Sequence, residues 1–294
     1  MHRNRPAVAL LLGLLSGSLP LGASAQGMPT LRDASSVRAA GMGGAARGFA
    51  SSGEALLINP AGIAATARFN VDLGAVFAPP TSSHLLGASA IDSKLNAEDA
   101  FALGGGAGYW HYQSGNGEAQ RKGSLIVLGL AAPLVPQTLF LGVAGRYLTL
   151  SGAVSSKAVT GDVGLLYKPV PSLGLAAVGY NLIDVHSAEA PRAWGFGLAV
   201  GRDADLHLDF DVRIDKDAQG GWKPEFQVGA EYLIGGVVEP RVGYVEDRLL
   251  GTRTLAMGLT LQYGGLALDA SYQKTLQTEG WAFGLALRLL ESPL

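Results

Sequence analysis

The feature that most constrains this chain is a strict alternation of apolar and polar residues that recurs along most of its length. The clearest example is LHLDFDVRID, where Leu206, Leu208, Phe210, Val212 and Ile214 alternate with histidine and charged residues. Residues that alternate in this way separate onto the two faces of a β-strand, whereas a helix would scatter them around its circumference. The sequence therefore predicts an all-β protein.

About 14 segments of this kind, each about ten residues long, follow one another between residues 67 and 291. Other clear examples are RFNVDLGAVF, EFQVGAEY, TLAMGLTLQY and WAFGLALRL, and turn signals such as SGNGE, KPVPS and KDAQGG separate the segments. A strand of this length can cross a hydrocarbon core when it is tilted. We expect the two longest connections, after Ile91 and after Leu182, to be extracellular loops and the short turns to be periplasmic.

Composition distinguishes a membrane barrel from a soluble sandwich. The mean hydropathy is +0.24, and Gly accounts for 42 of 294 residues, which disfavours long helices. In a soluble sandwich the second face of each strand meets water and would carry many Lys and Glu residues, but here it carries mainly Gly, Ala, Ser and Thr. The sequence predicts a transmembrane antiparallel β-barrel, with aromatic residues at the strand ends, including Tyr180 and Trp194, in the interface girdles.

The first 25 residues have the pattern of a cleaved signal peptide. Two arginines precede an apolar run over residues 7–22, and Ala23-Ser24-Ala25 supplies small residues for the cleavage site. The apolar run is shorter than the roughly 20 residues that a spanning helix needs. The chain also has no Cys, which excludes a disulfide framework and thiol chemistry. We expect export to the outer membrane of a Gram-negative bacterium.

Residues 26–66 do not alternate and contain the small-residue stretch SSVRAAGMGGAARGFASSGEALLINPAGIAA. Such a segment fits inside a barrel whose inward-facing residues are also small, so we interpret it as an N-terminal hatch. A short helix is expected near residues 52–57, with Ser51 or Ser52 as its cap. The predicted organisation is a signal peptide over residues 1–25, a hatch over 26–66 and a barrel over 67–291.

Two motifs of the hatch carry a family resemblance. RAAGMGGA, from Arg38, and NPAGIA, from Asn59, resemble the N-terminus of the outer-membrane long-chain fatty-acid transporter (FadL-like) superfamily, and in particular its shorter PorV/PorQ-type branch. The resemblance implies a 14-stranded barrel with an N-terminal plug. It also implies hatch residues that either pack the plug or gate the lumen, namely Arg38, Gly41, Gly43, Asn59, Pro60, Ala61 and Gly62.

Charged and polar residues on the predicted inward face have two possible roles. They line a polar lumen for a solute, or they form ion pairs that hold the hatch, with Arg38 and Arg47 as candidate partners, because buried charges must be paired or hydrated. These residues are His207, Asp209, Asp211, Arg213, Asp215, Glu225, Glu231, Glu239, Arg241 and Asp269.

Catalysis and metal binding are not predicted. His207 and Asp209 share a strand face, but the sequence has no GxSxG nucleophile motif. The alternating aspartates of DFDVRID lack the loop Gly and the closing Glu of an EF-hand. We therefore predict no enzyme activity, no catalytic residue, no metal and no cofactor. The 22 basic residues are scattered, so no nucleic-acid partner is expected.

Two functions remain open at this stage. The first is gated passage of a small hydrophobic compound across the outer membrane, with Pro240 as a position where the wall lacks a backbone donor. The alternative is a non-transporting barrel that docks a secreted or surface protein through its extracellular loops, as the PorV-type branch implies. The predicted partners are membrane lipid, a hydrophobic small molecule and a secreted or surface protein.

Overall fold

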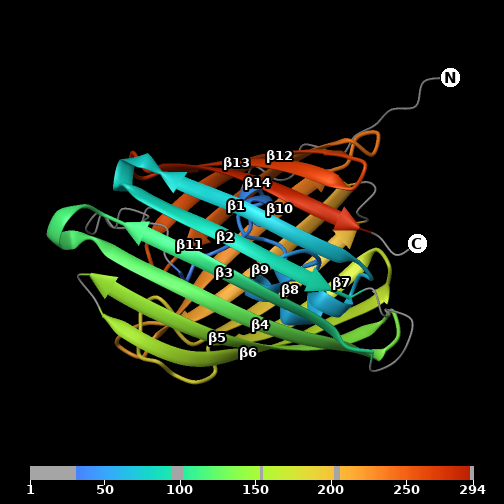
Figure 1. Cartoon of the computed structure of the whole chain (residues 1–294), viewed down its shortest axis with the longest axis horizontal. Coiled ribbons are helices and arrows are strands. Elements are labelled where there is room, and N and C mark those ends of the chain that lie inside the picture. The colour runs from blue at the N-terminus through green and yellow to red at the C-terminus, as the bar shows by residue number, and fades with distance from the viewer. Residues whose placement is uncertain (1–30, 94–101, 153–154, 202–205, 292–294) are drawn as a thin grey trace, which may run out of the picture.

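The protein is a closed antiparallel β-barrel of 14 strands (Figure 1). The computed structural model describes residues 31–93, 102–152, 155–201 and 206–291. Each strand pairs with its neighbours in sequence, and β1 closes the barrel by pairing with β14, with Val71 opposite Leu289. The predicted fold class and the predicted number of strands are confirmed.

Every alternating segment predicted from the sequence corresponds to one strand. The strands are β1 (Phe69–Ala78), β2 (Ser83–Asp92), β3 (Gly104–Ser114), β4 (Arg121–Val135), β5 (Leu139–Gly152), β6 (Ser156–Val170), β7 (Leu173–Tyr180), β8 (Ala193–Gly201), β9 (Leu206–Lys216), β10 (Trp222–Tyr232), β11 (Val238–Asp247), β12 (Thr252–Tyr263), β13 (Leu266–Thr275) and β14 (Trp281–Glu291). The helices are α1 (Val37–Gly41) and α2 (Ala55–Ile58), with 3₁₀ turns η1 (Pro60–Ala64), η2 (Pro79–Thr81) and η3 (Gly117–Ala119).

The barrel has two ends, and the order of the strands decides which connection lies at which end. We call the end where β1 begins and β14 finishes the terminal end, and the opposite end, where β1 turns into β2, the distal end. The connection after Leu182 joins β7 to β8 at the distal end, whereas the connection after Ile91 joins β2 to β3 at the terminal end. The expectation that both loops are extracellular is therefore wrong, because successive connections of an antiparallel barrel alternate between its ends.

The outer surface of the barrel is apolar. Large side chains on alternate positions point outward, as at Leu128, Met257 and Leu285, whose exposed fractions are 62%, 57% and 58%. The residues between them along each strand point inward and are mostly less exposed. None of the helices among the described residues has the length and apolarity to cross a bilayer.

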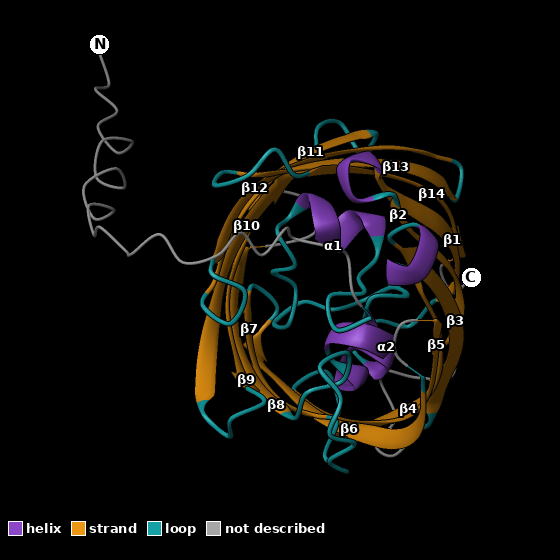
Figure 2. Ribbon diagram, turned by 90° about the vertical axis from the view of Figure 1, so that its left-hand side faces the viewer, coloured by secondary structure: helices purple, strands orange, loops and turns teal. Residues whose placement is uncertain are grey.

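Residues 31–66 lie inside the barrel (Figure 2). Helix α1 packs against β12 and β13, and α2 with η1 packs against β4, β5 and β6. The predicted short helix is present as α2, but Glu54, and not a serine, occupies its cap position. The predicted signal peptide and residues 26–30 of the predicted hatch lie outside the described residues, so the division of the chain at those positions stays a prediction. Below, "hatch" means residues 31–66.

The lumen has two chemically different halves. On β2–β6 the inward positions carry large buried apolar residues, and we call this wall the apolar half; it comprises Leu85, Ile91, Trp110, Tyr112, Leu125, Val127, Phe140, Leu148, Leu150 and Leu166. On β9–β14 the inward positions carry acids and arginines, and we call that wall the charged half. The sequence interpretation of a lumen lined by small and charged residues is wrong for the apolar half, because both faces of those strands are apolar.

Candidate functional site

The candidate site is the interface between the hatch and the inner wall, and its first element is Arg32. Its Nη2 donates to Asp215 Oδ2 at 2.6 Å and to Glu225 Oε2 at 2.8 Å, and its Nη1 donates to Asp247 Oδ2 at 2.7 Å. The carboxylates of Asp33, Glu225 and Asp247 lie within 4.8 Å of one another, a spacing that suits a cation, and the Arg32 guanidinium binds all three. Sequence reasoning missed Arg32, since it stands outside both hatch motifs.

Arg47 makes a second contact, with Asp211 of β9 and Tyr180 of β7. Its Nη1 lies 3.1 Å from Asp211 Oδ2, and the same oxygen accepts the backbone N–H of Arg47 at 2.9 Å. Its Nε donates to the Tyr180 hydroxyl at 2.9 Å, which in turn donates to the carbonyl of Ile58. The prediction that Tyr180 belongs to an interface girdle is wrong: the residue points into the lumen, where its hydroxyl has partners on the hatch.

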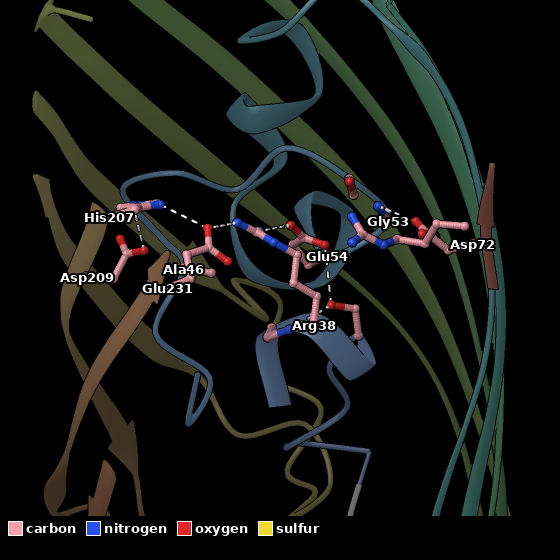
Figure 3. A network of polar contacts seen from close by, with 12 residues as sticks. Arg38, Ala46, Gly53, Glu54, Asp72, His207, Asp209 and Glu231 are labelled. Atoms are coloured by element: carbon pink, nitrogen blue, oxygen red, sulfur yellow. Dashed lines mark hydrogen bonds and ion pairs between the residues drawn. The ribbon is translucent and has the colours of Figure 1, made fainter. Parts of the chain in front are cut away.

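Arg38 makes the third contact and lies between Glu54 and Glu231 (Figure 3). Its Nη1 donates to Glu54 Oε1 at 2.7 Å, and its Nη2 donates to Glu231. Burial alone would raise the pKa of the Glu54 carboxyl, but the Arg38 guanidinium outweighs burial and holds that pKa below its usual value. The hatch arginines therefore pair with wall acids, as the ion-pair interpretation expected for Arg38 and Arg47.

His207 continues this network on the wall. Its Nδ1 lies 3.1 Å from Glu231 Oε1, and its Nε2 lies 3.0 Å from Asp209 Oδ2. The ring also packs against Phe49 of the hatch, with 4.2 Å between ring centroids. Both ring nitrogens of His207 therefore face carboxylates of the wall, and its ring faces the hatch.

The remaining predicted lumen residues also lie on the inner wall. Arg241 Nε donates to Glu231 Oε2 at 2.8 Å, and Arg213 Nε donates to Asp215 Oδ1 at 3.0 Å. Asp269 accepts from Arg288 Nη2 at 2.9 Å. All ten predicted inward residues are in ion pairs. Arg213 is half-buried, and the other nine are buried: His207, Asp209, Asp211, Asp215, Glu225, Glu231, Glu239, Arg241 and Asp269. Sequence reasoning left out Arg288 and Glu54, although Arg288 stands at an inward position of the last strand.

The backbone of the second hatch motif makes close contact with the apolar half. Asn59 Oδ1 accepts the N–H of Ala61 at 3.1 Å and so caps η1, while its Nδ2 donates to the carbonyl of Arg47 at 3.0 Å. Pro60 lies directly on Gly142 of β5, where an added Cβ would stand 2.2 Å from the Pro60 carbonyl carbon. The motif therefore sits where only glycine on the wall leaves room for the hatch backbone.

The first hatch motif makes an equivalent contact with the charged half. A Cβ added at Gly243 of β11 would stand 2.1 Å from the carbonyl carbon of Met42, and one added at Gly41 would stand 2.9 Å from Gly258 Cα. Gly43 has φ +68°, a conformation that favours glycine. Gly62 packs against the backbone of Ala50 within the hatch. The seven predicted hatch residues therefore all lie in the lumen, but the two motifs contact opposite halves of the wall. Arg38 makes ion pairs, Asn59 makes hydrogen bonds, and the contacts given for Gly41, Pro60 and Gly62 are close packing.

A cavity of about 210 Å³ lies between the hatch and the wall at the distal end. Its apolar side includes Leu85, Leu125 and Leu148, and its charged side includes Arg32, Glu225 and Asp247. An apolar cavity of about 150 Å³ is already large enough to hold benzene. The cavity can therefore hold a molecule with a single ring. Its apolar side suits the ring, and its charged side suits a polar substituent.

The sequence matches no protein-family model and no curated protein sequence. The structure is similar to solved structures described as the "CymD monoaromatic hydrocarbon channel", the toluene transporter TbuX of Ralstonia pickettii and a FadL homologue of Pseudomonas aeruginosa, with TM-scores of 0.62, 0.61 and 0.63. Identities are 13%, 12% and 12%; the matches cover 86%, 88% and 89% of this chain and 96%, 98% and 98% of the other chains. The likeness establishes the fold, and the narrower PorV/PorQ-type prediction is not confirmed.

Proposed function

We propose that this protein is an outer-membrane barrel through which a small hydrophobic compound passes, and that movement of the hatch opens the passage. The cavity between the hatch and the wall, one side of which is apolar, carries the proposal. The apolar outer surface and the predicted signal peptide support a place in the outer membrane of a Gram-negative bacterium. The similar structures described as a hydrocarbon channel and a toluene transporter support the class of compound.

The hatch must move because it fills the lumen beside the cavity. Met42, Leu56 and Ile63 are fully buried between the hatch and the wall, and the hatch backbone touches the wall at Gly142 on one half and at Gly243 on the other. A compound that enters at the distal end therefore meets the hatch before it can continue toward the terminal end. We propose the predicted hatch residues, from Arg38 to Gly62, as the anchors that hold the closed state.

A reversible tether tests the proposal, since the chain has no Cys of its own. A Cβ added at Gly284 of β14 would stand 3.1 Å from Val37 Cγ2 of α1, which places Val37→Cys and Gly284→Cys within disulfide reach. In cells that produce the full chain, uptake of radiolabelled toluene should fall by about tenfold when this pair is oxidised. Reduction should restore uptake.

The matched control is Ser271→Cys with Gly284→Cys, because these residues face each other on β13 and β14 and their disulfide leaves the hatch free. Oxidation of the control pair should leave uptake unchanged. If the Val37–Gly284 tether has no effect, hatch movement is not required. If the untethered protein gives no uptake above that of cells without it, passage itself is wrong.

The docking alternative makes a different prediction. A barrel that only presents its loops to a secreted protein has no use for a cavity between the hatch and the wall, so the cavity favours passage. A pull-down from intact envelopes distinguishes the two functions. A stoichiometric secreted protein on a barrel that does not raise toluene uptake would support docking.

A further inference from the structure

We infer that the outer surface of β2–β6, near the distal end, binds the anionic phosphate of a membrane lipid. The inference goes beyond the proposed function, since it concerns the outside of the barrel and neither the hatch nor the cavity. Two rows of polar side chains, two exposed lysines within them and an adjoining apolar surface carry it.

The polar side chains form two neighbouring rows across strands that lie side by side in the wall (Figure 1). In the register of the sheet, the first row consists of His111, Ser124, Thr149 and Lys157. The second row, one step closer to the distal end, consists of His84, Gln113, Lys122 and Ser151. All of these positions alternate with buried residues and so face outward. Neighbouring strands are about 5 Å apart, so the two rows form one continuous surface, which we call the polar patch.

Other lysines at the distal end stand beside acids. Lys216 Nζ, at the end of β9, lies 3.3 Å from Asp184 Oδ2. Lys274 Nζ, near the end of β13, lies 3.7 Å from Glu279 Oε2. The charge of each of these lysines is therefore balanced by a carboxylate of the barrel itself.

Lys122 and Lys157 of the polar patch differ in this respect. Both are exposed, and neither forms an ion pair within the part of the chain that the structure describes. The outward positions of β3, β4, β5 and β6 carry no Asp or Glu. Glu118, in the turn that joins β3 to β4, is exposed and pairs with neither lysine among the described residues. The polar patch is therefore positive and attracts an anion.

The patch also supplies neutral hydrogen-bond donors next to each lysine. Lys122 stands opposite Gln113 on β3, and Lys157 stands opposite Thr149 on β5. An ammonium beside an amide or a hydroxyl is a set of donors that suits the several acceptor oxygens of a phosphate. A carboxylate would have fewer oxygens with which to use these donors.

The surface next to the patch is one that acyl chains can contact. The next row toward the terminal end consists of Tyr109, Ile126, Tyr147 and Val159, whose exposed fractions lie between 40% and 62%. The Tyr109 hydroxyl lies 3.0 Å from Ser124 Oγ, so this row meets the polar patch directly. Tyrosines between an apolar band and a polar rim are typical of a membrane interface.

A lipid is the occupant that matches both surfaces with one molecule. Its phosphate contacts the lysines, while its chains cover the tyrosine row and the apolar wall beyond, as at Leu128. A free phosphate ion would meet only the exposed charges, and water and salt screen that attraction. The apolar surface therefore favours the lipid over the free ion.

Native mass spectrometry of the full chain in mild detergent tests the inference with two lipids that share the same acyl chains. Phosphatidylglycerol carries a net negative charge, whereas the choline of phosphatidylcholine neutralises its phosphate. Phosphatidylglycerol should bind about tenfold more tightly, because lysines near an anionic headgroup contribute about fivefold each. A large excess of inorganic phosphate should not displace it, since the free ion has no chains.

The double variant Lys122→Gln with Lys157→Gln should lower the preference for phosphatidylglycerol to about onefold. Lys122→Arg with Lys157→Arg keeps both charges and should keep the preference. The matched control is Lys216→Gln with Lys274→Gln, which removes two lysines of the same end that already have carboxylate partners. The control should also keep the preference.

Three results would overturn the inference. Equal binding of the two lipids by the unaltered protein would show that the patch does not recognise a phosphate. A loss of preference as large in the control as in the double variant would assign the effect to net charge. Displacement of phosphatidylglycerol by inorganic phosphate would make the free ion the occupant.

Toluene uptake separates this inference from the proposed function. Lys122 and Lys157 lie on the outside of the barrel, away from the hatch, so their double variant should take up toluene as the unaltered protein does. A failure of lipid recognition would therefore leave passage standing, and a failure of passage would leave lipid recognition standing.

Discussion

The two halves of the lumen contact the same hatch through different interactions, apolar packing on one half and ion pairs on the other. On the apolar half, α2 and η1 pack into a cluster of leucine, isoleucine and aromatic side chains. On the charged half, Arg32, Arg38 and Arg47 reach separate sets of carboxylates along β9, β10 and β11. Apolar packing is favourable in proportion to the area removed from water, whereas a buried ion pair is favourable only while every member keeps its partner.

This difference indicates which side of the hatch separates first. When water enters the charged half, it hydrates the separated ions and so offsets much of the lost attraction. When water enters the apolar half, it meets only hydrocarbon and the separation has no such compensation. We therefore expect the hatch to leave the charged half first and to pivot on α2 and η1.

The largest expected effect comes from removing one partner of the charged half. Arg38→Met leaves Glu54 without its guanidinium and deprives Glu231 of one of its partners, which should lower the free energy of unfolding by about 3–5 kcal/mol. Urea unfolding of the protein in detergent, followed by tryptophan fluorescence, measures the change.

The double variant Arg38→Met with Glu54→Leu sharpens this prediction. Glu231 keeps Arg241 and His207, so removing Glu54 as well should recover part of the lost stability. A double variant as unstable as the sum of the two single variants would mean that the charges do not act as a pair.

The next largest effect is expected in the apolar half. Leu56 of α2 is fully buried, and Leu56→Ala should lower the free energy of unfolding by about 3 kcal/mol because it leaves a cavity. Leu56→Met, which nearly conserves volume, should cost less than about 1.5 kcal/mol in the same urea titration. A loss as small for alanine as for methionine would show that α2 is not the fixed side of the hatch.

A smaller effect is expected where hatch backbone meets wall glycine. Gly243→Ala should cost about 1–3 kcal/mol and should increase protease cleavage within the hatch, because the new Cβ overlaps the Met42 backbone. Gly142→Ala should cost a similar amount, since Pro60 makes the same contact on the apolar half. Gly145→Ala is the control, because nothing lies within 4 Å of its added Cβ. If the control matched either variant, the backbone contacts would not position the hatch.

The barrel could be predicted from the sequence because its signal is local. In β9, alternate residues from Leu206 to Ile214 identify the strand and its two faces without any knowledge of the neighbouring strands. The lumen acids on that strand follow from the same alternation. Strand order then follows from short connections between antiparallel neighbours.

The contacts of the lumen could not be predicted, since they depend on residues far apart in the chain. Arg32 and Asp247 are 215 positions apart, and no periodicity relates them. Tyr180 ends a strand in the sequence as a girdle residue would, and only the Arg47 and Ile58 groups opposite it explain its inward orientation. The apolar half could not be predicted because the alternation of apolar and polar residues is weak where both faces of a strand are hydrophobic. Leu125 and Ile126 of β4 are an example.

The arginines of the hatch also have a consequence for the order in which the molecule is made. They belong to the first part of the chain to be synthesised, yet their carboxylates stand on β9, β10 and β11, 193 residues later for Arg38 and Glu231. Joining segments so distant is slow, because the intervening chain must be ordered first. We therefore expect biogenesis to pass through a barrel whose lumen is still unoccupied. Docking of Arg32 then reports that the strands up to β11 are in place, since only a nearly complete wall offers it Asp215, Glu225 and Asp247 together.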